Sequence, residues 1–215
     1  MRVLSTLIAI LLLGCSLTLA DAADLTLEGS PYHPIVYVTA EDVARARSAI
    51  ASETDAQAWY NTLLAEWSNW KDKSPEWIRD VMPDEGACFA YGFTGCPICG
   101  GRWSAWGAAK CSFDNPGHVE CSKGHILPNE KCPDAGTGYV ASDGRIHYLV
   151  GSYNAWVVET LCAKIASPCS DIYALSDDEQ AGRMAAVILD EFARIYPSCD
   201  KGSWDYPSNP PSGRF

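Results

Sequence analysis

Positive charge is scarce in this sequence. Its 215 residues contain 16 Lys and Arg against 27 Asp and Glu, which gives a formal net charge of −11. A nucleic-acid-binding protein meets the phosphates with a basic surface, and this composition offers no such footprint. The hydrophobic content of 47% and the charged content of 20% are ordinary for a globular protein, which argues against general disorder.

The sequence also lacks the motifs of several common enzyme classes. It contains no phosphate-binding glycine loop, no dinucleotide fingerprint and no Ser/His/Asp arrangement. Convincing alternation of apolar and polar residues, the pattern of half-buried strands, is absent as well. The sequence therefore favours a mainly α fold and excludes the nucleotide-dependent enzymes with recognisable motifs.

No apolar run is long enough to span a membrane. The longest stretch occupies residues 3–13, after Arg2, and falls short of the about 18 residues that a transmembrane helix needs. One positive charge, an apolar run and then small residues are typical of a secretion signal, which we place at residues 1–23. We therefore expect an exported protein that is periplasmic, secreted or located at the cell surface.

The sequence allows two alternative processing sites at the end of this signal. Ala20-Asp21-Ala22 matches an A-x-A cleavage site, which would release the protein. Leu12-Leu13-Gly14-Cys15 is close to a lipobox, which would leave a lipid on Cys15. A lipid at Cys15 is the only membrane attachment that the sequence suggests.

Cysteine is abundant, and its spacing is the most informative feature of the chain. Six of the ten cysteines lie between Gly86 and Gly138, in a segment rich in glycine. Cys96-Pro-Ile-Cys99-Gly-Gly is typical of a zinc knuckle, in which glycines let backbone N–H groups turn toward two sulfurs on one ion. The second half-site, Cys121-Ser-Lys-Gly124-His125, has glycine where a second C-x-x-C would place a cysteine.

We therefore predict a structural zinc site. Its predicted ligands are Cys96, Cys99, Cys121 and His125, and the fourth position stays open between His125, Cys111 and Cys132. The alternative is that these cysteines form disulfides, because exported proteins permit them. Removal of Cys15 with the signal leaves nine cysteines, an odd number that fits a mixture of ligands and bridges better than a pure disulfide framework. The expected bridges between helices involve Cys162, Cys169 and Cys199.

The segment 31–85 carries helix signals. Thr39 and Asp42 form a capping box, and Thr54 and Gln57 form a second, which predicts a helix to about Lys73. Ser74 before Pro75 is typical of a further helix start. A tryptophan-rich stripe at helical spacing predicts a core face, with a sugar-stacking surface as the alternative. The stripe consists of Trp59, Leu63, Trp67 and Trp70.

The segment 141–197 predicts a helical hairpin. An apolar stripe from Ile146 to Ile165 indicates one helix beginning near Asp143, which we expect to break at residues 167–171. Ser176 and Glu179 form a third capping box, and the following helix is expected to end at Pro197. Its predicted core face is Met184, Ile188, Leu189, Phe192 and Ile195. Between the two helical segments, residues 86–140 form an irregular insertion, and residues 198–215 form an irregular tail.

Three sets of residues resemble a known family. They are HPIVYVTAEDVARARSAIA; the insertion with CPICGGRW and GHILPNEKCPDAGTGY; and the helices NAWVVETLCAKIA and YALSDDEQAGRMAAVILDEFARIYP. Together they resemble the N-terminal region of heparinase II/III-like and alginate-lyase-like polysaccharide lyases. The resemblance implies an incomplete α/α toroid of helical hairpins with a zinc-ribbon-like insertion. It also implies β-elimination on an acidic, uronic-acid polysaccharide.

The catalytic residues of that family are expected beyond this chain, which we interpret as part of a longer lyase. Residues 145–154 nevertheless hold the types that a uronate site needs, and Arg145 is suited to a carboxylate. The competing interpretation is a solvated helix start and a core tyrosine. The candidate substrate-binding residues are Arg145, His147, Tyr153 and Asn154. A non-catalytic carbohydrate-binding or interaction module at the cell surface is the second hypothesis.

Overall fold

The computed structural model describes residues 38–89, 95–101 and 110–199. The predicted signal, Cys15 and most of the predicted tail lie outside the described residues. The chain divides into two compact units, residues 1–44 and 45–215. In the described part of the chain, every helix is too short or too polar to cross a membrane.

The first unit contains the start of helix α2 (Ala40–Ser52). The predicted capping box is confirmed there. The backbone N–H of Asp42 donates to Thr39 Oγ1 at 3.2 Å, and the backbone N–H of Thr39 donates to Asp42 Oδ2 at 2.8 Å. Both groups satisfy N–H donors that have no partner inside the helix.

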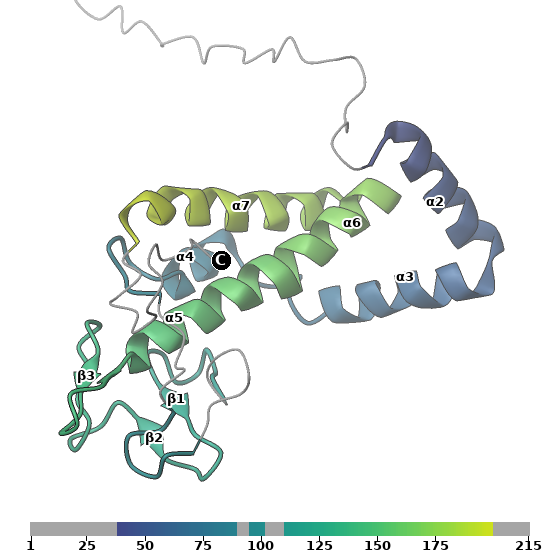
Figure 1. The fold of residues 1–215 in the computed structure, drawn as a ribbon. Helices are drawn as coiled ribbons and strands as arrows, with labels where there is room; N and C mark the ends of the chain where they lie inside the picture. The colour runs from purple at the N-terminus through teal and green to yellow at the C-terminus, as the bar shows by residue number, and fades with distance from the viewer. Residues whose placement is uncertain (1–37, 90–94, 102–109, 200–215) are drawn as a thin grey trace, which may run out of the picture. The chain divides into compact units, whose positions relative to one another are not determined.

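The second unit is mainly helical, as the sequence predicts (Figure 1). Helices α3 and α4 precede the irregular segment, and the remaining helices follow it. Most buried apolar side chains of this unit belong to these later helices. The elements are α3 (Thr54–Trp67), α4 (Pro75–Val81), α5 (Leu149–Glu159), the π-helical segment η1 (Thr160–Ala166), α6 (Ser167–Ser176), α7 (Glu179–Ile195) and the 3-10 turn η2 (Tyr196–Ser198).

Helices α5, η1 and α6 follow one another without a break, so the predicted interruption at residues 167–171 is wrong. A proline inside an α-helix clashes with the carbonyl four residues back, here that of Lys164. Before Pro168 the helix widens into η1, and the backbone N–H of Ser167 bonds the carbonyl of Cys162, five residues back. This longer bonding register lets the helix pass the proline.

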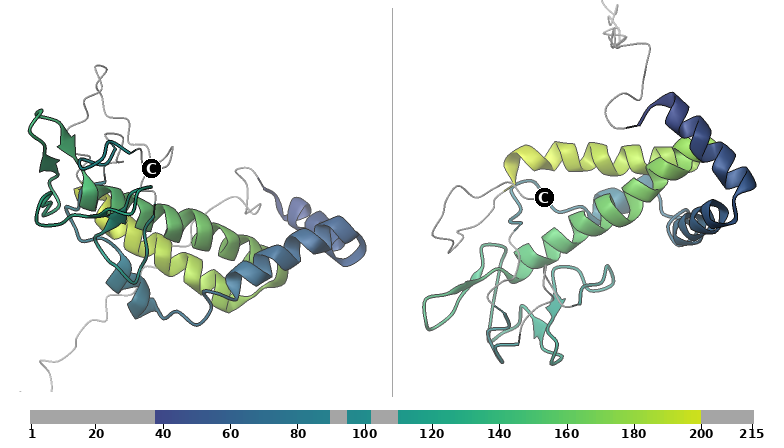
Figure 2. Two further views of the ribbon diagram at one scale, coloured as in Figure 1. Left: turned by 90° about the horizontal axis from the view of Figure 1, so that it is seen from below. Right: turned by 45° about the vertical axis from the view of Figure 1, so that its right-hand side comes forward.

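Helix α7 packs against η1 and α6 (Figure 2). Its N-cap is Asp178, whose carboxylate accepts from the backbone N–H of Gln180 and Ala181. The predicted cap, Ser176, is instead the last residue of α6, and its hydroxyl donates to the carbonyl of Ile172. Gly182 is required in α7, because a Cβ there would lie 2.7 Å from the ring of Tyr173.

The predicted apolar faces are correct in part. In α7, Met184, Ile188 and Ile195 are buried, but Leu189 is exposed. Helix α3 ends at Trp67, earlier than Lys73, and its first turn has no side-chain cap. Along the tryptophan-rich stripe, Trp59 near the start of α3 is 50% exposed, whereas Trp67 at its end is buried.

Ser74 caps α4 as predicted, accepting from the backbone N–H of Trp77.

Among the described residues, four short strands form two antiparallel hairpins between α4 and α5, the second of which extends past the predicted insertion boundary at residue 140. Strand β1 (Val119–Glu120) pairs with β2 (Ile126–Leu127), and β3 (Tyr139–Val140) pairs with β4 (Ile146–His147). The expectation of a helix from Asp143 is therefore wrong, because residues 143–147 belong to the second hairpin. Two-residue strands bury too little of one face to show an alternating pattern in the sequence.

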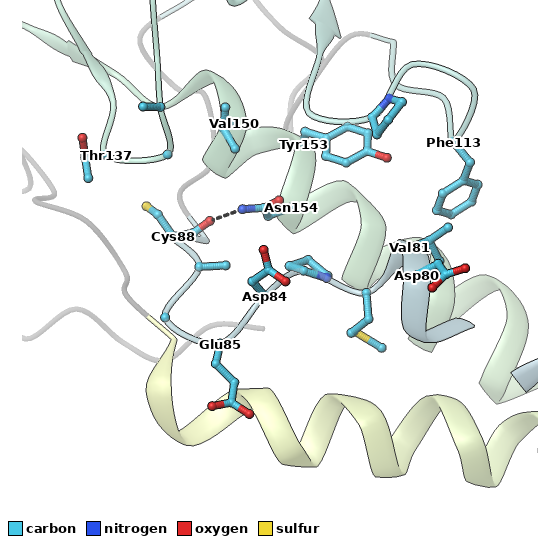
Figure 3. A pocket seen from close by; sticks show the side chains of 17 residues that line it. Asp80, Val81, Asp84, Glu85, Cys88, Phe113, Thr137, Val150, Tyr153 and Asn154 are labelled. Atoms are coloured by element: carbon cyan, nitrogen blue, oxygen red, sulfur yellow. Dashed lines mark hydrogen bonds between the residues drawn. The ribbon is translucent and has the colours of Figure 1, made fainter. Parts of the chain in front are cut away.

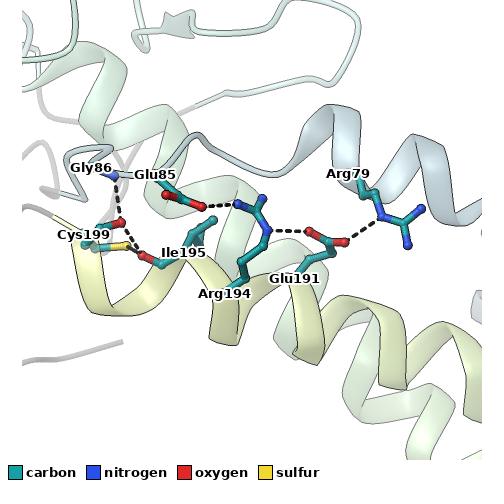
Figure 4. Close-up of polar contacts among 8 residues, drawn as sticks. Arg79, Glu85, Gly86, Glu191, Arg194, Ile195 and Cys199 are labelled. Carbon is teal, nitrogen blue, oxygen red and sulfur yellow. Dashed lines mark hydrogen bonds and ion pairs between the residues drawn. The ribbon is translucent and has the colours of Figure 1, made fainter. Parts of the chain in front are cut away.

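An ion network joins α4 to α7 (Figure 4). Glu191, which is 7% exposed, accepts from Arg79 Nε at 2.7 Å and from Arg194 Nε at 3.0 Å. Arg194 also contacts Glu85 at 2.6 Å. Hydrogen bonds from Arg79, and then from Arg194, lower the pKa of Glu191, while burial acts in the opposite direction. The buried carboxylate is therefore stabilised by both guanidinium groups.

Candidate metal centre and adjoining cavity

Two tight turns present the candidate ligands. In the first, the backbone N–H of Gly100 donates to the carbonyl of Cys96 at 2.8 Å. In the second, the backbone N–H of Gly124 donates to the carbonyl of Cys121 at 2.9 Å. Both glycines have positive φ, +65° and +82°, a conformation that other residues rarely adopt. We call these two turns, residues 96–101 and 121–125, the knuckles.

Backbone N–H groups turn toward the sulfurs, as the glycine-rich spacing predicts. Gly101 N–H donates to Cys99 Sγ at 3.4 Å, and His125 N–H donates to Cys121 Sγ at 3.3 Å. Such donors stabilise a thiolate. Each knuckle therefore has the local chemistry of half a metal site.

The tertiary structure brings the two knuckles together. One ligand atom from each of Cys96, Cys99, Cys121 and His125 lies within 4.8 Å of the other three. His125 Nδ1 lies 3.3 Å from Cys121 Sγ and 3.8 Å from Cys96 Sγ, while the sulfurs of Cys99 and Cys121 are 3.9 Å apart. These four residues are the ligand set that the sequence predicts, with His125 in the fourth position.

Three of the six separations between the ligand atoms fit a tetrahedral ion. With Zn–S near 2.3 Å and Zn–N near 2.0 Å, the edges of a tetrahedron are about 3.5–3.8 Å. The three separations above, from 3.3 to 3.9 Å, fall close to these edges. Cys96 and Cys121 are fully or nearly fully buried, so a cation held by them is largely shielded from water.

The thiols of the cluster differ in acidity. Burial raises the pKa of Cys96 to about 11, against the lowering effect of nearby backbone N–H groups. Burial also acts to raise the pKa of Cys121, but hydrogen bonds from the backbone N–H groups of His125 and Lys123 and contacts with the side chains of His125 and Cys96 together lower it to about 7. Because a metal binds thiolates, loading of the cluster releases the protons that these thiols still carry.

Cys111 and Cys132, the alternative fourth ligands, stand outside this cluster. Burial raises the pKa of Cys111 to about 12, so it remains a thiol. None of the nine cysteines in the described part of the chain forms a disulfide. The predicted bridges of Cys162, Cys169 and Cys199 are therefore not formed in the structure.

Asp134 attaches the irregular segment between α4 and α5 to the helices, and the sequence interpretation missed it. Its Oδ2 accepts from the backbone N–H of Leu149 and Val150, the first residues of α5, and its Oδ1 accepts from those of Gly136 and Gly138. An aspartate followed by two spaced glycines was the available signal, since it is typical of a tight turn around a carboxylate. A second attachment is the 3.0 Å contact between His147 Nδ1 and the carbonyl of Gly95, next to the first knuckle.

A cavity of about 590 Å³ lies beside this attachment (Figure 3). One wall is the end of α4 and the loop after it, and the opposite wall is the start of α5. The irregular segment completes the cavity through Phe113, Pro116 and residues 135–137. The lining residues are residues 80–88, Phe113, Pro116, residues 135–137, Val150, Tyr153 and Asn154.

The four predicted substrate-binding residues fall into two pairs. Tyr153 and Asn154 lie on α5 and line the cavity, where Asn154 Nδ2 donates to the carbonyl of Cys88 at 3.0 Å. His147 is buried in the second hairpin, and Arg145 is exposed there and paired with Asp143 at 2.7 Å. The structure does not bring Arg145 or His147 to the cavity lining.

Comparisons of the chain with protein-family profiles, curated proteins and solved structures find no match. The functional assignment therefore depends on the chemistry of the Cys₃His cluster and of the cavity.

Proposed function

We propose that Cys96, Cys99, Cys121 and His125 bind one zinc ion as a structural centre. The observation that supports this most directly is the convergence of the four ligand atoms within 4.8 Å, with three of their six separations at 3.3–3.9 Å, close to the edges of a zinc tetrahedron. Three sulfurs and one imidazole favour zinc over calcium or magnesium, which prefer oxygen ligands. All four positions are supplied by protein, as in structural sites, whereas catalytic zinc keeps one position for water or substrate.

The role of this ion is to shape the segment between α4 and α5. Among the described residues of this segment, the strands are only two residues long, and the buried apolar side chains besides cysteine and proline are Met82, Phe89, Val119 and Leu127. In segments of this kind, the free energy of metal binding contributes the folding stability that a hydrophobic core would otherwise provide. The same segment carries Asp134, which caps α5, and Phe113, which lines the cavity, so the centre supports both features.

Metal content and thiol titration on the purified protein test this centre. We expect one zinc per chain and three thiols that react only after chelation. Cys96→Ser should lose the metal, and the matched control Cys162→Ser should keep it. A metal-free protein with all its thiols reactive in the folded state would contradict the proposal.

The wider activity that we propose is that of a polysaccharide lyase. The helical hairpin after the irregular segment, in which α6 packs on α7, supports this proposal, and the resemblance implies β-elimination on a uronic-acid polymer. We place the catalytic residues beyond this chain. The test is ultraviolet absorbance after incubation with uronic-acid polysaccharides, because elimination creates a conjugated double bond. A longer form of the protein should form this product, and a longer form without activity on any uronate polymer would contradict the assignment.

One observation favours the second candidate, a non-catalytic carbohydrate-binding module. Trp59 on α3 is 50% exposed, and exposed aromatic faces stack on sugar rings. Retardation of the protein in a gel that contains polysaccharide tests this role. Trp59→Ala should abolish the retardation, whereas Tyr173→Ala, which removes another half-exposed aromatic side chain, should not.

A further inference from the structure

The cavity beside α5 is acidic. Three carboxylates lie at its rim, those of Asp80, Asp84 and Glu85, and no Lys, Arg or His occurs among the described residues that line it. Glu85 is paired with Arg194 at 2.6 Å. Within the described part of the chain, no hydrogen bond or ion pair is formed by the carboxylates of Asp80 and Asp84. An anionic sugar is therefore repelled from this space, and a cationic group is attracted to it.

A hydrogen-bond donor lies in the wall. Tyr153 is 5% exposed as a residue and lines the cavity, and its hydroxyl has no hydrogen-bond partner among the described residues. In the described part of the chain, Thr160 Oγ1 is the one buried side-chain oxygen or nitrogen without a partner, so the Tyr153 hydroxyl itself is accessible and can donate to a ligand. Burial raises the pKa of Tyr153 to about 12, so the group remains a donor at physiological pH. A ligand in the cavity with an acceptor oxygen would satisfy it.

The carboxylates do not form a metal cage. In the described part of the chain, the Cys₃His cluster is the only group of three or more His, Cys, Asp or Glu ligand atoms that converge within 4.8 Å. The carboxylates of the cavity are spread around about 590 Å³, a volume suited to a small organic molecule. The spread charges favour an organic cation over a divalent metal ion.

Apolar side chains also line the cavity. They are Val81, Met82, Val150 and the ring of Phe113. Figure 3 shows Phe113 and Tyr153 on the same side of the space, with Asp84 and Glu85 on the side of α7. A sugar ring has an apolar C–H face for such a wall, hydroxyl oxygens that accept from Tyr153, and a position for an amine.

We propose that this cavity binds a protonated amino sugar. Its ammonium group is attracted by the negative charges of Asp80 and Asp84, its ring packs on Phe113, and a ring hydroxyl accepts from Tyr153. An aliphatic diamine would satisfy the carboxylates but would leave the Tyr153 hydroxyl without an acceptor. This site is separate from the zinc centre and does not depend on the lyase activity.

Ligand-detected NMR titration of the metal-loaded protein tests the proposal, with four probes at equal concentration. We expect glucosamine to bind, N-acetylglucosamine to bind at least about fivefold more weakly because it lacks the charge, and glucuronate not to bind. Putrescine should bind more weakly than glucosamine. Equal binding of glucuronate, tighter binding of putrescine, or no binding of glucosamine would overturn the proposal.

Two variants test whether glucosamine binds in the cavity. Asp84→Asn should weaken glucosamine binding about fivefold, and Tyr153→Phe should weaken glucosamine but not putrescine. The matched control, Asp143→Asn, removes an exposed carboxylate in the second hairpin and should leave binding unchanged. Unchanged binding in Asp84→Asn would overturn the proposal. Zinc content measured on the same samples separates this result from failure of the metal centre.

Discussion

The carboxylate of Asp134 accepts a hydrogen bond from the backbone N–H of Leu149 at 2.8 Å, at the first residue of α5. Asp134 belongs to the glycine-rich segment, and the residue that precedes the helix, Tyr148, supplies no side-chain cap. A negative group at this end of a helix satisfies free N–H donors and interacts favourably with the helix dipole. The irregular segment and the helical core thus stabilise one another through this carboxylate.

Asp134→Ala should therefore lower the free energy of unfolding by about 2–3 kcal/mol. The substitution leaves four backbone N–H groups without their charged acceptor, and hydrogen bonds to charged groups contribute about 1.5–3 kcal/mol each, with partial compensation by water. Urea unfolding followed by circular dichroism measures the change. Asp114→Ala, which removes an exposed carboxylate from the same segment, should change the value by less than about 1 kcal/mol. Equal effects of the two substitutions would contradict a capping role.

His125→Ala and His125→Cys should differ in their zinc content. Alanine removes the fourth ligand, whereas cysteine offers a thiolate at the same position in the second knuckle. We expect His125→Ala to lose most of its zinc, and His125→Cys to retain it, because four thiolates form a normal structural site. Metal analysis after dialysis against a weak chelator provides the measurement. Retention of zinc by His125→Ala would indicate another fourth ligand.

Chelation of the metal should loosen the irregular segment before the helices. The long-range contacts between α6 and α7 do not involve the knuckles, so most of the helical signal should remain. Hydrogen exchange should increase in residues 110–140 and at the first turn of α5, where the Asp134 cap depends on the segment. The measurement is exchange by mass spectrometry with and without chelator. Uniform loss of protection over α7 would show that the metal supports the whole fold.

Glu191→Gln should make stability less sensitive to acid. Hydrogen bonds from Arg79, and then from Arg194, lower the pKa of Glu191 below its usual value of 4.5. A depressed folded-state pKa contributes stability that is complete above the unfolded-state pKa and is lost as the pH falls through the folded-state value. The Tm of the natural protein should thus fall more steeply below about pH 4.5 than that of the variant. Glu130→Gln, at an exposed position, should keep the natural profile.

Gly138→Ala should destabilise the protein more than Gly144→Ala. Both glycines have positive φ, +94° and +80°, so both substitutions carry a backbone cost of about 1–2 kcal/mol. At Gly138 the added Cβ would also lie 2.5 Å from Ile146 Cγ2, while at Gly144 it would meet nothing within 4 Å. Overlap of this kind adds about 1–3 kcal/mol. Thermal unfolding of the two variants should therefore show the lower Tm for Gly138→Ala.

Features that depend on neighbouring residues could be predicted from the sequence. The Thr39 capping box, the Ser74 cap and the first knuckle all form within a few residues, so their spacing alone brings the groups together. The exposed position of Trp59 and the continuation of the helix past Pro168 could not be predicted in this way. A helix face is buried only where another segment covers it, and a proline is tolerated only where the surrounding packing holds a wider turn.

The sequence by itself determined the two knuckles, because glycine at positive φ and the spacing of the ligands shape each turn locally. It left the fourth ligand open among His125, Cys111 and Cys132, since all three are compatible with the spacing. Only the tertiary structure brings His125, and not Cys111 or Cys132, into the cluster, by placing its Nδ1 3.8 Å from Cys96 Sγ, 29 residues earlier in the chain. It also decided that Asp134 meets Leu149, because contacts between distant segments depend on how those segments pack and not on the order of their residues.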